Sequence, residues 1–459
     1  MAGSVETSSG HVAVLGFPFG GHTGPLLGLV FGLARKMPGT RFSFFTTSRA
    51  NRQTFSERDG NIPGNIKPYD VADGIPGDYA FTGNPHEPAN LFIMSAPENY
   101  RVAIESAVKE TGKRVTGILA DSFLPFAADM AEELQVPLVF LWVAMPHNLY
   151  VYLFLDEVCR ISSGGSVNGS SVNVIHGVPS IRVEDLPEGV IEPGDLEGCL
   201  LLDILDGMNQ TLPRAAATVL NFFQELDPTP LSSHLLSKFP SFRYLGFLTL
   251  SLPTPRKGLQ EETGCLAWLD RQEPGSVAYI GFGTLAVLGH DELFALAKVL
   301  EQCKIPYLWS LKDNLKGDLP AGFIERTCGH GIVVPWVPQI QVLGHPSVGV
   351  FVTHCGSNSV YESIANGVPM ICRPVFGEQR MVGRLVTEVW EVGVRVDSGL
   401  MTEDGLIRSF QVIFRDERGR KMREKAQALK ELVKAAAGPE GKAAEDLKDV
   451  VEILSVSSV

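Results

Sequence analysis

The sequence lacks the features that mark several large classes of protein. The chain has no apolar run of about 18 residues, the length that spans a membrane. Its first ten residues, MAGSVETSSG, have neither a basic start nor an apolar stretch. We therefore expect no membrane span and no signal peptide, and a cytoplasmic protein. Lysine and arginine number 39 against 52 aspartates and glutamates, a formal net charge of −13, which disfavours a nucleic-acid partner because phosphate backbones are bound by clustered basic residues.

Cysteine is sparse as well. The seven cysteines are an odd number, widely spaced, and no two have the C-x2-C or C-x4-C separation of a zinc site. The spacing therefore disfavours a structural zinc site. It favours reduced thiols, as in a cytosolic protein.

The remaining composition is that of a globular protein. Hydrophobic residues make up 44% and charged residues 20% of the chain. Its length of 459 residues exceeds what a single hydrophobic core usually organises. Residues 251–263, SLPTPRKGLQEET, combine prolines with mixed charges and no periodicity, as interdomain linkers do. We therefore predict one domain over residues 1–250, this linker, and a second domain over 264–440.

Buried strands alternate with helical stretches in both halves. HVAVLGF (11–17) precedes a helical stretch at 25–37, and RFSFFTT, VTGILADS, PLVFLWV, ATVLNFF and RYLGFL are further strand candidates. After the linker, the strand candidates are SVAYIGFG, PYLWSL, GIVVP, VGVFVT and PMICRP, with helical stretches between them and a helical close over 411–450. This pattern predicts an α/β fold with two parallel sheets and a ligand cleft at the carboxyl ends of their strands.

The loop THCGSNS (353–359) follows one of these strands and precedes a helix. Gly356 permits close backbone approach, and Ser357, Asn358 and Ser359 are favoured residue types at a helix N-cap. A helix N-terminus carries about half a positive charge, which suits a phosphate. His354 can donate a further hydrogen bond, so we predict an anion-binding loop.

Three other interpretations of this loop stay open. Cys355 lies beside a histidine near a helix start, as an acidified nucleophilic thiol would, although a small buried cysteine packed behind the loop is commoner. A metal site is disfavoured because no nearby residues complete a set of four ligands. A capped helix without any ligand is the third interpretation.

The loop FPFGGHTG (17–24) follows the first strand and contains His22. It matches neither G-x-G-x-x-G nor G-K-[ST], and no acidic residue ends the second strand, so a nicotinamide or P-loop site is disfavoured. His22 is a candidate general base, the alternative being a plain surface histidine. Asp121, at the end of GILADS, can orient that histidine, or else cap the following helix. No serine nucleophile stands out, which suggests that His22 activates a hydroxyl of the acceptor.

A longer stretch carries a family resemblance. The 44 residues WVPQIQVLGHPSVGVFVTHCGSNSVYESIANGVPMICRPVFGEQ (336–379) resemble the donor-binding signature of plant UDP-sugar-dependent glycosyltransferases. GFPFGGHTGPLL, APENYRVAIESAVKETGKRVTGILADSFLPFAADMAEEL and AATVLNFFQELDP resemble the flavonoid 3-O-glycosyltransferases within that family. The resemblance implies the GT-B fold: two facing Rossmann-like domains, the first binding the acceptor and the second the UDP-sugar, with a final helix (441–459) returning to the first domain.

The resemblance also implies the donor site. Trp336 would stack on uracil, the backbone of Val337 would bind the base edge, and Gln339 and Glu362 would hold the nucleoside. Diphosphate contacts would come from Thr284, His354, Asn358 and Ser359, and sugar contacts from Glu378, Gln379 and Trp142, with Ser357 at a position where tryptophan is frequent.

The implied acceptor pocket is aromatic, which suits a flat phenolic molecule. Its expected lining is Phe19, His22, His86, Phe123, Met145, Tyr152, Phe376 and Gly377. The sequence departs from the family pattern at Gly21, Val143, Gly281, Ser357 and Glu378, where threonine, threonine, serine, tryptophan and aspartate, respectively, are common.

The implied reaction is inverting transfer of glucose from UDP-glucose to the 3-hydroxyl of a flavonol or anthocyanidin, with His22 as base and Asp121 orienting it. Gln379 favours glucose, since galactose users of this family often carry histidine there. We expect no metal, no other cofactor and a monomer. The alternatives are UDP-galactose or another small phenol as substrate, a nicotinamide-dependent oxidoreductase, and a non-catalytic UDP-sugar-binding protein.

Overall fold

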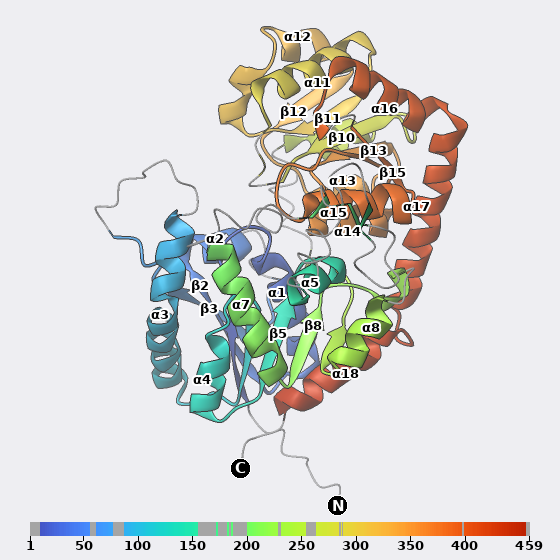
Figure 1. The fold of residues 1–459 in the computed structure, drawn as a ribbon. Coiled ribbons are helices and arrows are strands. Elements are labelled where there is room, and N and C mark those ends of the chain that lie inside the picture. The colour runs from blue at the N-terminus through green and yellow to red at the C-terminus, as the bar shows by residue number, and fades with distance from the viewer. Residues whose placement is uncertain are drawn as a thin grey trace, which may run out of the picture.

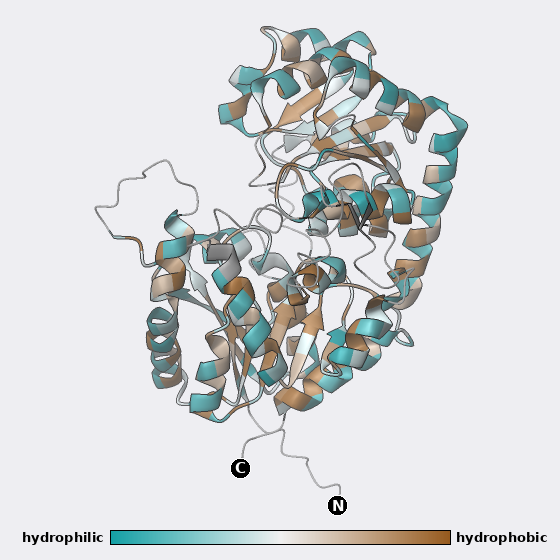
Figure 2. Cartoon of the chain, viewed as in Figure 1, coloured by the Kyte–Doolittle hydropathy of each residue, from teal (hydrophilic) through white to brown (hydrophobic). Residues whose placement is uncertain are grey.

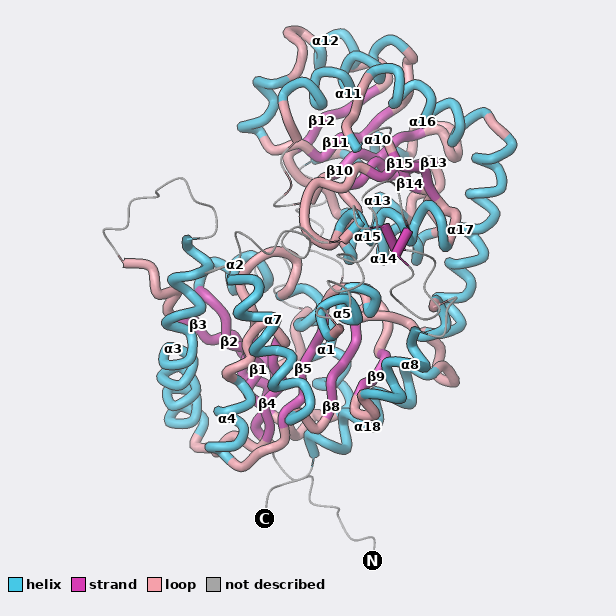
Figure 3. Tube along the Cα trace, in the orientation of Figure 1, coloured by secondary structure: helices cyan, strands magenta, loops and turns pink. Residues whose placement is uncertain are grey.

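The computed structural model contains two α/β units, each built on its own sheet (Figure 1). It describes residues 10–55, 61–76, 87–154, 171–172, 181–182, 185–186, 200–227, 231–253, 263–283, 286, 288–396 and 399–455. Figure 3 shows the strands inside each unit with helices around them. The α/β fold class predicted from the alternating strands and helices is therefore confirmed.

The N-terminal sheet has seven described strands in the order β3-β2-β1-β4-β5-β8-β9, all parallel. Their bounds are β1 His11–Leu15, β2 Arg41–Thr47, β3 Ile66–Val71, β4 Gly117–Asp121, β5 Leu138–Trp142, β8 Ala217–Leu220 and β9 Phe242–Tyr244. The chain order reverses between β1 and β4, and at such a switch point the loops after the two strands diverge and leave a crevice.

Helices cover both faces of this sheet because its strands are apolar on both sides. Val12 and Val14 of β1 belong to one hydrophobic cluster, and Ala13 and Leu15 belong to another. The helices of this unit are α1 Thr23–Lys36, α2 Ser48–Phe55, α3 Glu87–Thr111, α4 Ala127–Leu134, α5 Pro146–Leu153, α7 Leu200–Thr211 and α8 Leu231–Lys238. Figure 2 shows the brown apolar strands beneath helices with teal outer faces.

The C-terminal sheet has six described strands in the order β12-β11-β10-β13-β14-β15, also parallel. Its strands are β10 Val277–Gly281, β11 Tyr307–Ser310, β12 Gly331–Val334, β13 Val348–Thr353, β14 Met370–Cys372 and β15 Gly393–Arg395. The surrounding helices are α10 Cys265–Leu269, α11 His290–Gln302, α12 Phe323–Thr327, α13 Gln339–Leu343, α14 Ser357–Asn366, α15 Gln379–Arg384, α16 Glu403–Arg415 and α17 Glu417–Ala436.

The last helix, α18 (Lys442–Ser455), packs on the N-terminal unit. Asp446 Oδ2 accepts a hydrogen bond of 2.7 Å from the backbone N–H of Tyr244 in β9, and Arg243 pairs with Asp449 at 2.8 Å. Val450 and Leu454 are buried in the same hydrophobic cluster as Val12 and Val14 of β1. Figure 1 shows α17 descending from one unit to the other, where α18 begins.

Four described strands lie outside the sequence prediction: β3, β15, and the short pair β6 Ser171–Val172 and β7 Ile181–Arg182, which are antiparallel to each other. β3 and β15 are edge strands of their sheets. Among the described residues, no helix is long and apolar enough to cross a membrane.

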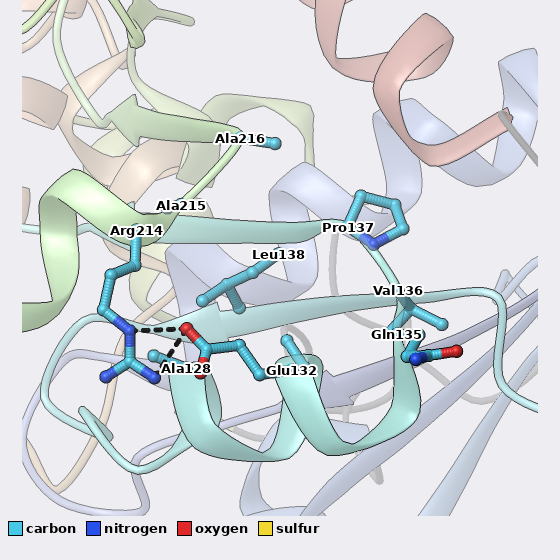
Figure 4. A pocket seen from close by; sticks show the side chains of 10 residues that line it. Ala128, Glu132, Gln135, Val136, Pro137, Leu138, Arg214, Ala215 and Ala216 are labelled. Carbon is cyan, nitrogen blue, oxygen red and sulfur yellow. Dashed lines mark hydrogen bonds and ion pairs between the residues drawn. The ribbon is translucent and has the colours of Figure 1, made fainter. Parts of the chain in front are cut away.

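A pocket in the N-terminal unit opens between α4 and the start of β5 (Figure 4). Arg214 lines it, and its guanidinium is already paired with Asp129 at 2.7 Å and Glu132 at 2.8 Å. The pocket lies at the amino end of β5, whereas Asp121 and Trp142 end their strands at the opposite edge. It is therefore separate from the candidate active site.

Candidate active site

A histidine and an aspartate meet at the carboxyl edge of the N-terminal sheet. β1 and β4 are neighbours, so the loop after β1 and the end of β4 lie close together. His22 Nδ1 and Asp121 Oδ2 are 2.8 Å apart, with the aspartate side chain fully buried and the histidine 15% exposed. Asp121 Oδ1 also accepts from the backbone N–H of Phe123 at 2.9 Å. Asp121 does not cap α4, which begins only at Ala127.

This contact settles the form of the neutral imidazole. A carboxylate oxygen only accepts, so Nδ1 of His22 carries the proton and donates it to Asp121. Nε2 is then left with a lone pair and can accept a proton. The pair has the chemistry of an oriented general base.

Aromatic rings surround His22. Its ring centroid is 4.7 Å from that of Phe123 and 5.0 Å from that of Phe17. The ring centroid of Phe19 is 5.3 Å from that of Phe17 and 5.5 Å from that of Phe92. The sequence prediction named Phe19 and Phe123 but missed Phe17 and Phe92. Phe17 follows β1 and Phe92 lies in α3, and both resemble ordinary core residues in the sequence.

Three further predicted residues lie next to this aromatic group. Trp142 is buried, its ring is 6.0 Å from both Phe123 and Tyr152, and its Nε1 donates to the carbonyl of Met145 at 3.1 Å. Met145 and Tyr152 are also buried.

Among the described residues, no ring contact joins the other predicted acceptor residues to this aromatic group. Phe376 is 37% exposed, and Gly377, with φ of 59°, follows it in the loop before α15. His86, like Thr284 of the donor set, lies outside the described residues.

The predicted anion loop ends at α14, which begins at Ser357. The N-cap is Gly356 and not one of the polar residues expected there, so Ser357, Asn358 and Ser359 lie in the first turn itself. A Cβ at Gly356 would come within 2.5 Å of His354 Nε2, so only glycine fits beside that ring. No described group hydrogen-bonds the buried atoms Ser357 Oγ and His354 Nδ1. Buried polar atoms without partners indicate a site for a polar ligand.

Burial controls the charge of three groups in this region. It lowers the pKa of His354 to about 4, so His354 is neutral near pH 7 and offers a hydrogen bond rather than a charge. Burial raises the pKa of Glu362 to about 7, and it raises the pKa of Glu378 as well.

Gln339, Ser359 and Glu362 form one hydrogen-bonded group. Gln339 Nε2 donates to Glu362 Oε2 at 2.8 Å and to Ser359 Oγ at 3.1 Å. The hydroxyl of Tyr279 donates to Gln339 Oε1 at 2.7 Å, which orients the amide. The sequence prediction missed Tyr279 because it lies within an apolar strand.

The same tyrosine accounts for one departure from the family pattern. A Cβ at Gly281 would lie 2.9 Å from the Tyr279 hydroxyl, so glycine leaves the space that this hydroxyl occupies. Trp336 and Val337 precede Gln339 in the loop before α13; the tryptophan is partly exposed and the valine is buried.

Gln379 begins α15 and is 4% exposed. Its Oε1 accepts from the backbone N–H groups of Val375 at 2.8 Å and Phe376 at 3.2 Å. The amide is thereby oriented with its NH2 group as the remaining donor. Gln379 can therefore donate to a ligand hydroxyl.

The thiol and metal interpretations find no support. Cys355 is fully buried, and burial raises the pKa of its thiol well above the usual value, the opposite of an activated nucleophile. Within the described ranges, no three His, Cys, Asp or Glu side chains are grouped to hold a metal ion.

The two units meet at the candidate site. Asn358, in the first turn of α14, donates to the carbonyl of Gly21 at 2.9 Å, one residue before His22. The candidate anion site and the candidate base therefore face each other. Two facing parallel α/β units with these groups between them define a glycosyltransferase of the GT-B fold.

The chain belongs to the UDP-glucoronosyl and UDP-glucosyl transferase family, whose family model matches residues 257–432. It is 43% identical to the flavonol 3-O-glucosyltransferase of Arabidopsis thaliana over 98% of both chains. It is 42% identical to an anthocyanidin 3-O-glucosyltransferase of Vitis vinifera, over 98% of this chain and 99% of that protein. A solved structure of UDP-glucose: anthocyanidin 3-O-glucosyltransferase in complex with UDP superposes with a TM-score of 0.90 at 41% identity, covering 98% of this chain and 99% of that one.

Proposed function

We propose that this glycosyltransferase moves glucose from UDP-glucose to the 3-hydroxyl of a flavonol or anthocyanidin, with inversion at the anomeric carbon. The observation that carries the proposal is the 2.8 Å contact between His22 Nδ1 and Asp121 Oδ2. This contact leaves Nε2 of His22 as a proton acceptor beside aromatic rings. The preceding residue, Gly21, accepts a hydrogen bond from Asn358 in the first turn of α14.

The proposed step has one base and one leaving group. His22 Nε2 takes the proton of the acceptor hydroxyl while that oxygen attacks the anomeric carbon of the sugar. The bond from that carbon to the diphosphate oxygen breaks, and UDP leaves with the electron pair. Asp121 stays ionised and stabilises the imidazolium that forms.

The leaving diphosphate is stabilised by dipoles and hydrogen bonds in this proposal. The first turn of α14 presents backbone N–H groups and the positive end of the helix. Neutral His354, Asn358 and Ser359 add donors, and Thr284 is the remaining proposed contact. A metal ion is not required for this stabilisation.

In this proposal, residues near the start of α13 and in α14 bind the nucleoside, and residues at the start of α15 bind the sugar. Trp336 would stack on the uracil and the backbone of Val337 would bind its edge, while Gln339 and Glu362 would bind the ribose. Glu378 and Gln379, with Trp142 from the other unit, would bind the sugar. Gln379, at a position where galactose users of this family often carry histidine, is the basis for proposing glucose over galactose.

Substitution of His22 tests the proposed base. His22→Ala should lower kcat by about 10²–10⁴-fold, since that is the usual contribution of a general base. The dissociation constant for UDP, measured by calorimetry, should stay unchanged because His22 makes no proposed contact with the nucleotide. A matched control is His290→Ala, another histidine facing an aspartate, which is 62% exposed on α11 and 3.5 Å from Asp318. Undiminished turnover by His22→Ala would show that another group is the base.

We also propose a monomeric enzyme of the cytosol. The described cysteines, Cys265, Cys303, Cys328, Cys355 and Cys372, are unpaired, which suits a reducing compartment. Light scattering coupled to size-exclusion chromatography measures the oligomeric state, and a dimer mass would overturn that part of the proposal.

A further inference from the structure

Asn221, at the end of β8, is a fully buried side chain that the proposed mechanism does not use. Its Oδ1 accepts from the backbone N–H of Leu248 at 2.9 Å, which fixes the orientation of the amide. Its Nδ2 donates to the carbonyl of Val143 at 2.8 Å and to Asn358 Oδ1 at 3.2 Å. Both N–H donors of the Asn221 amide are therefore used, and one of these bonds crosses to the other unit.

Asn358 continues the chain of hydrogen bonds. Its Oδ1 accepts from Asn221, so its Nδ2 is directed to the carbonyl of Gly21 at 2.9 Å. The amides of Asn221 and Asn358 thereby connect three segments: the end of β8, the first turn of α14 and the loop that carries His22. None of these bonds depends on a bound ligand.

Gly21 is the point where this chain reaches the base. A Cβ at position 21 would lie 2.9 Å from Asn358 Nδ2, closer than real contacts allow, and that amide would have to move. The glycine, in place of the threonine common in the family, therefore leaves the space that Asn358 needs to bond to the main chain beside His22.

We propose that Asn221 and Gly21 are positioning residues for sugar transfer. Through Asn358 they fix the first turn of α14, which is proposed to hold the diphosphate, relative to His22. An in-line displacement needs the base, the acceptor oxygen and the anomeric carbon in register, and an error of about 1 Å can cost 10²-fold in rate. The inference rests on the proposed function.

Gly21→Ala is the most direct variant. Residue 21 is exposed and its φ is not in the left-handed region, so alanine fits the backbone and the fold should be kept. Gly24→Ala is the matched control, because a Cβ there meets only Thr249 at an ordinary 3.8 Å. Both are made in the native protein and in an Asn358→Ala background, as a double-mutant cycle.

We expect Gly21→Ala to lower kcat by about 10-fold in the native background. In the Asn358→Ala background, where the displaced amide is absent, it should have almost no effect. Gly24→Ala should leave kcat near that of its parent in both backgrounds. Equal losses from Gly21→Ala in both backgrounds, or no loss in either, would overturn the proposal.

Asn221→Ala provides a second measurement. It should lower kcat by more than it raises the KM for UDP-glucose, at a temperature where unfolding measurements show the variant to be folded. A merely structural role predicts no such split, and unchanged kcat in the folded variant would count against the inference.

The proposed function can fail separately. Absence of transfer from UDP-glucose by the unsubstituted protein counts against that function alone. The same cycle is then measured through the dissociation constant for UDP, which Gly21→Ala should raise by about threefold only where Asn358 is present. Equal effects on UDP binding in both backgrounds would overturn the positioning role.

Discussion

Glu362 and His354 lie in the proposed donor site, and burial disfavours the charged form of each. The pKa of the glutamate is raised to about 7 and that of the histidine is lowered to about 4. Both groups therefore resist ionisation while the site holds no ligand. Ribose hydroxyls that donate to Glu362 would favour its charged form, so ligand binding and ionisation should be linked.

Glu362→Gln tests this at the level of stability. An unfolded glutamate ionises near 4.5 and the folded one near 7, so the unfolded chain loses its proton first and the free energy of unfolding falls as pH rises through that window. The total fall is about 3 kcal/mol. Glutamine cannot titrate, and Gln339 can still donate to it. Denaturant unfolding of both proteins, without UDP, measures this difference. Relative to the unsubstituted protein, the free energy of unfolding of Glu362→Gln should rise by that amount between pH 4 and pH 8.

The same substitution should weaken UDP binding, because glutamine accepts less strongly from hydroxyl groups than a carboxylate does. Parallel stability profiles of the two proteins from pH 4 to pH 8 would contradict the raised pKa. The comparison needs ligand-free protein, since UDP would stabilise the native state of each variant to a different extent.

Some residues of the site could be predicted from the sequence and others could not. His22 and Asp121 were predicted to lie at the same edge of the sheet, because His22 is in the loop after one strand and Asp121 ends another. Tyr279 lies inside a strand, and Asn221 falls within the predicted strand ATVLNFF, so neither was singled out as a site residue. A tyrosine inside an apolar strand looks like core, and an asparagine at a strand end looks like a turn, until the partner from a distant segment is known.

At the scale of elements, the central strands and the helices beside the site were the predictable part. β1, β4, β5, β10 and β13 are apolar on both faces and were all predicted. β3, with alternating exposure and an internal proline, and β15, with only three residues, carry no such signal. Edge strands are specified by their neighbours more than by their own residues. The site was unaffected, because it lies on the central strands.

α18 should stabilise the N-terminal unit. Leu454 is 2% exposed, and a Cβ at Gly117 would come within 3.0 Å of its side chain. Leu454→Ala removes buried methyl groups and should lower the free energy of unfolding by about 2–4 kcal/mol. The control is Glu452→Ala on the exposed side of the helix. Equal unfolding midpoints for the two variants would show that α18 adds nothing to this core.

At the scale of the whole molecule, the two units contribute different groups to one reaction. The N-terminal unit carries the proposed base and the proposed aromatic acceptor site, and the C-terminal unit carries the proposed diphosphate site. The formal net charge is −13, so attraction of an anionic donor depends on local groups and not on the field of the whole protein. The first turn of α14 supplies such a group.

Removal of metal ions tests whether those local groups suffice. Dialysis against excess EDTA should leave the initial rate of transfer unchanged, because the helix N-terminus and neutral donors stabilise the leaving UDP in the proposed step. The rate is measured before and after dialysis, with Mg²⁺ added back as a control. A loss that Mg²⁺ restores would contradict the metal-free mechanism.

The most direct test of the account is a matrix of donors and acceptors with the product position determined. UDP-glucose, UDP-galactose and UDP-rhamnose are each paired with kaempferol, quercetin and cyanidin, and kcat/KM is measured for every pair. The account predicts the highest value with UDP-glucose and products glycosylated at the 3-hydroxyl with inverted configuration. Preference for UDP-galactose, or attachment at another hydroxyl, would contradict it.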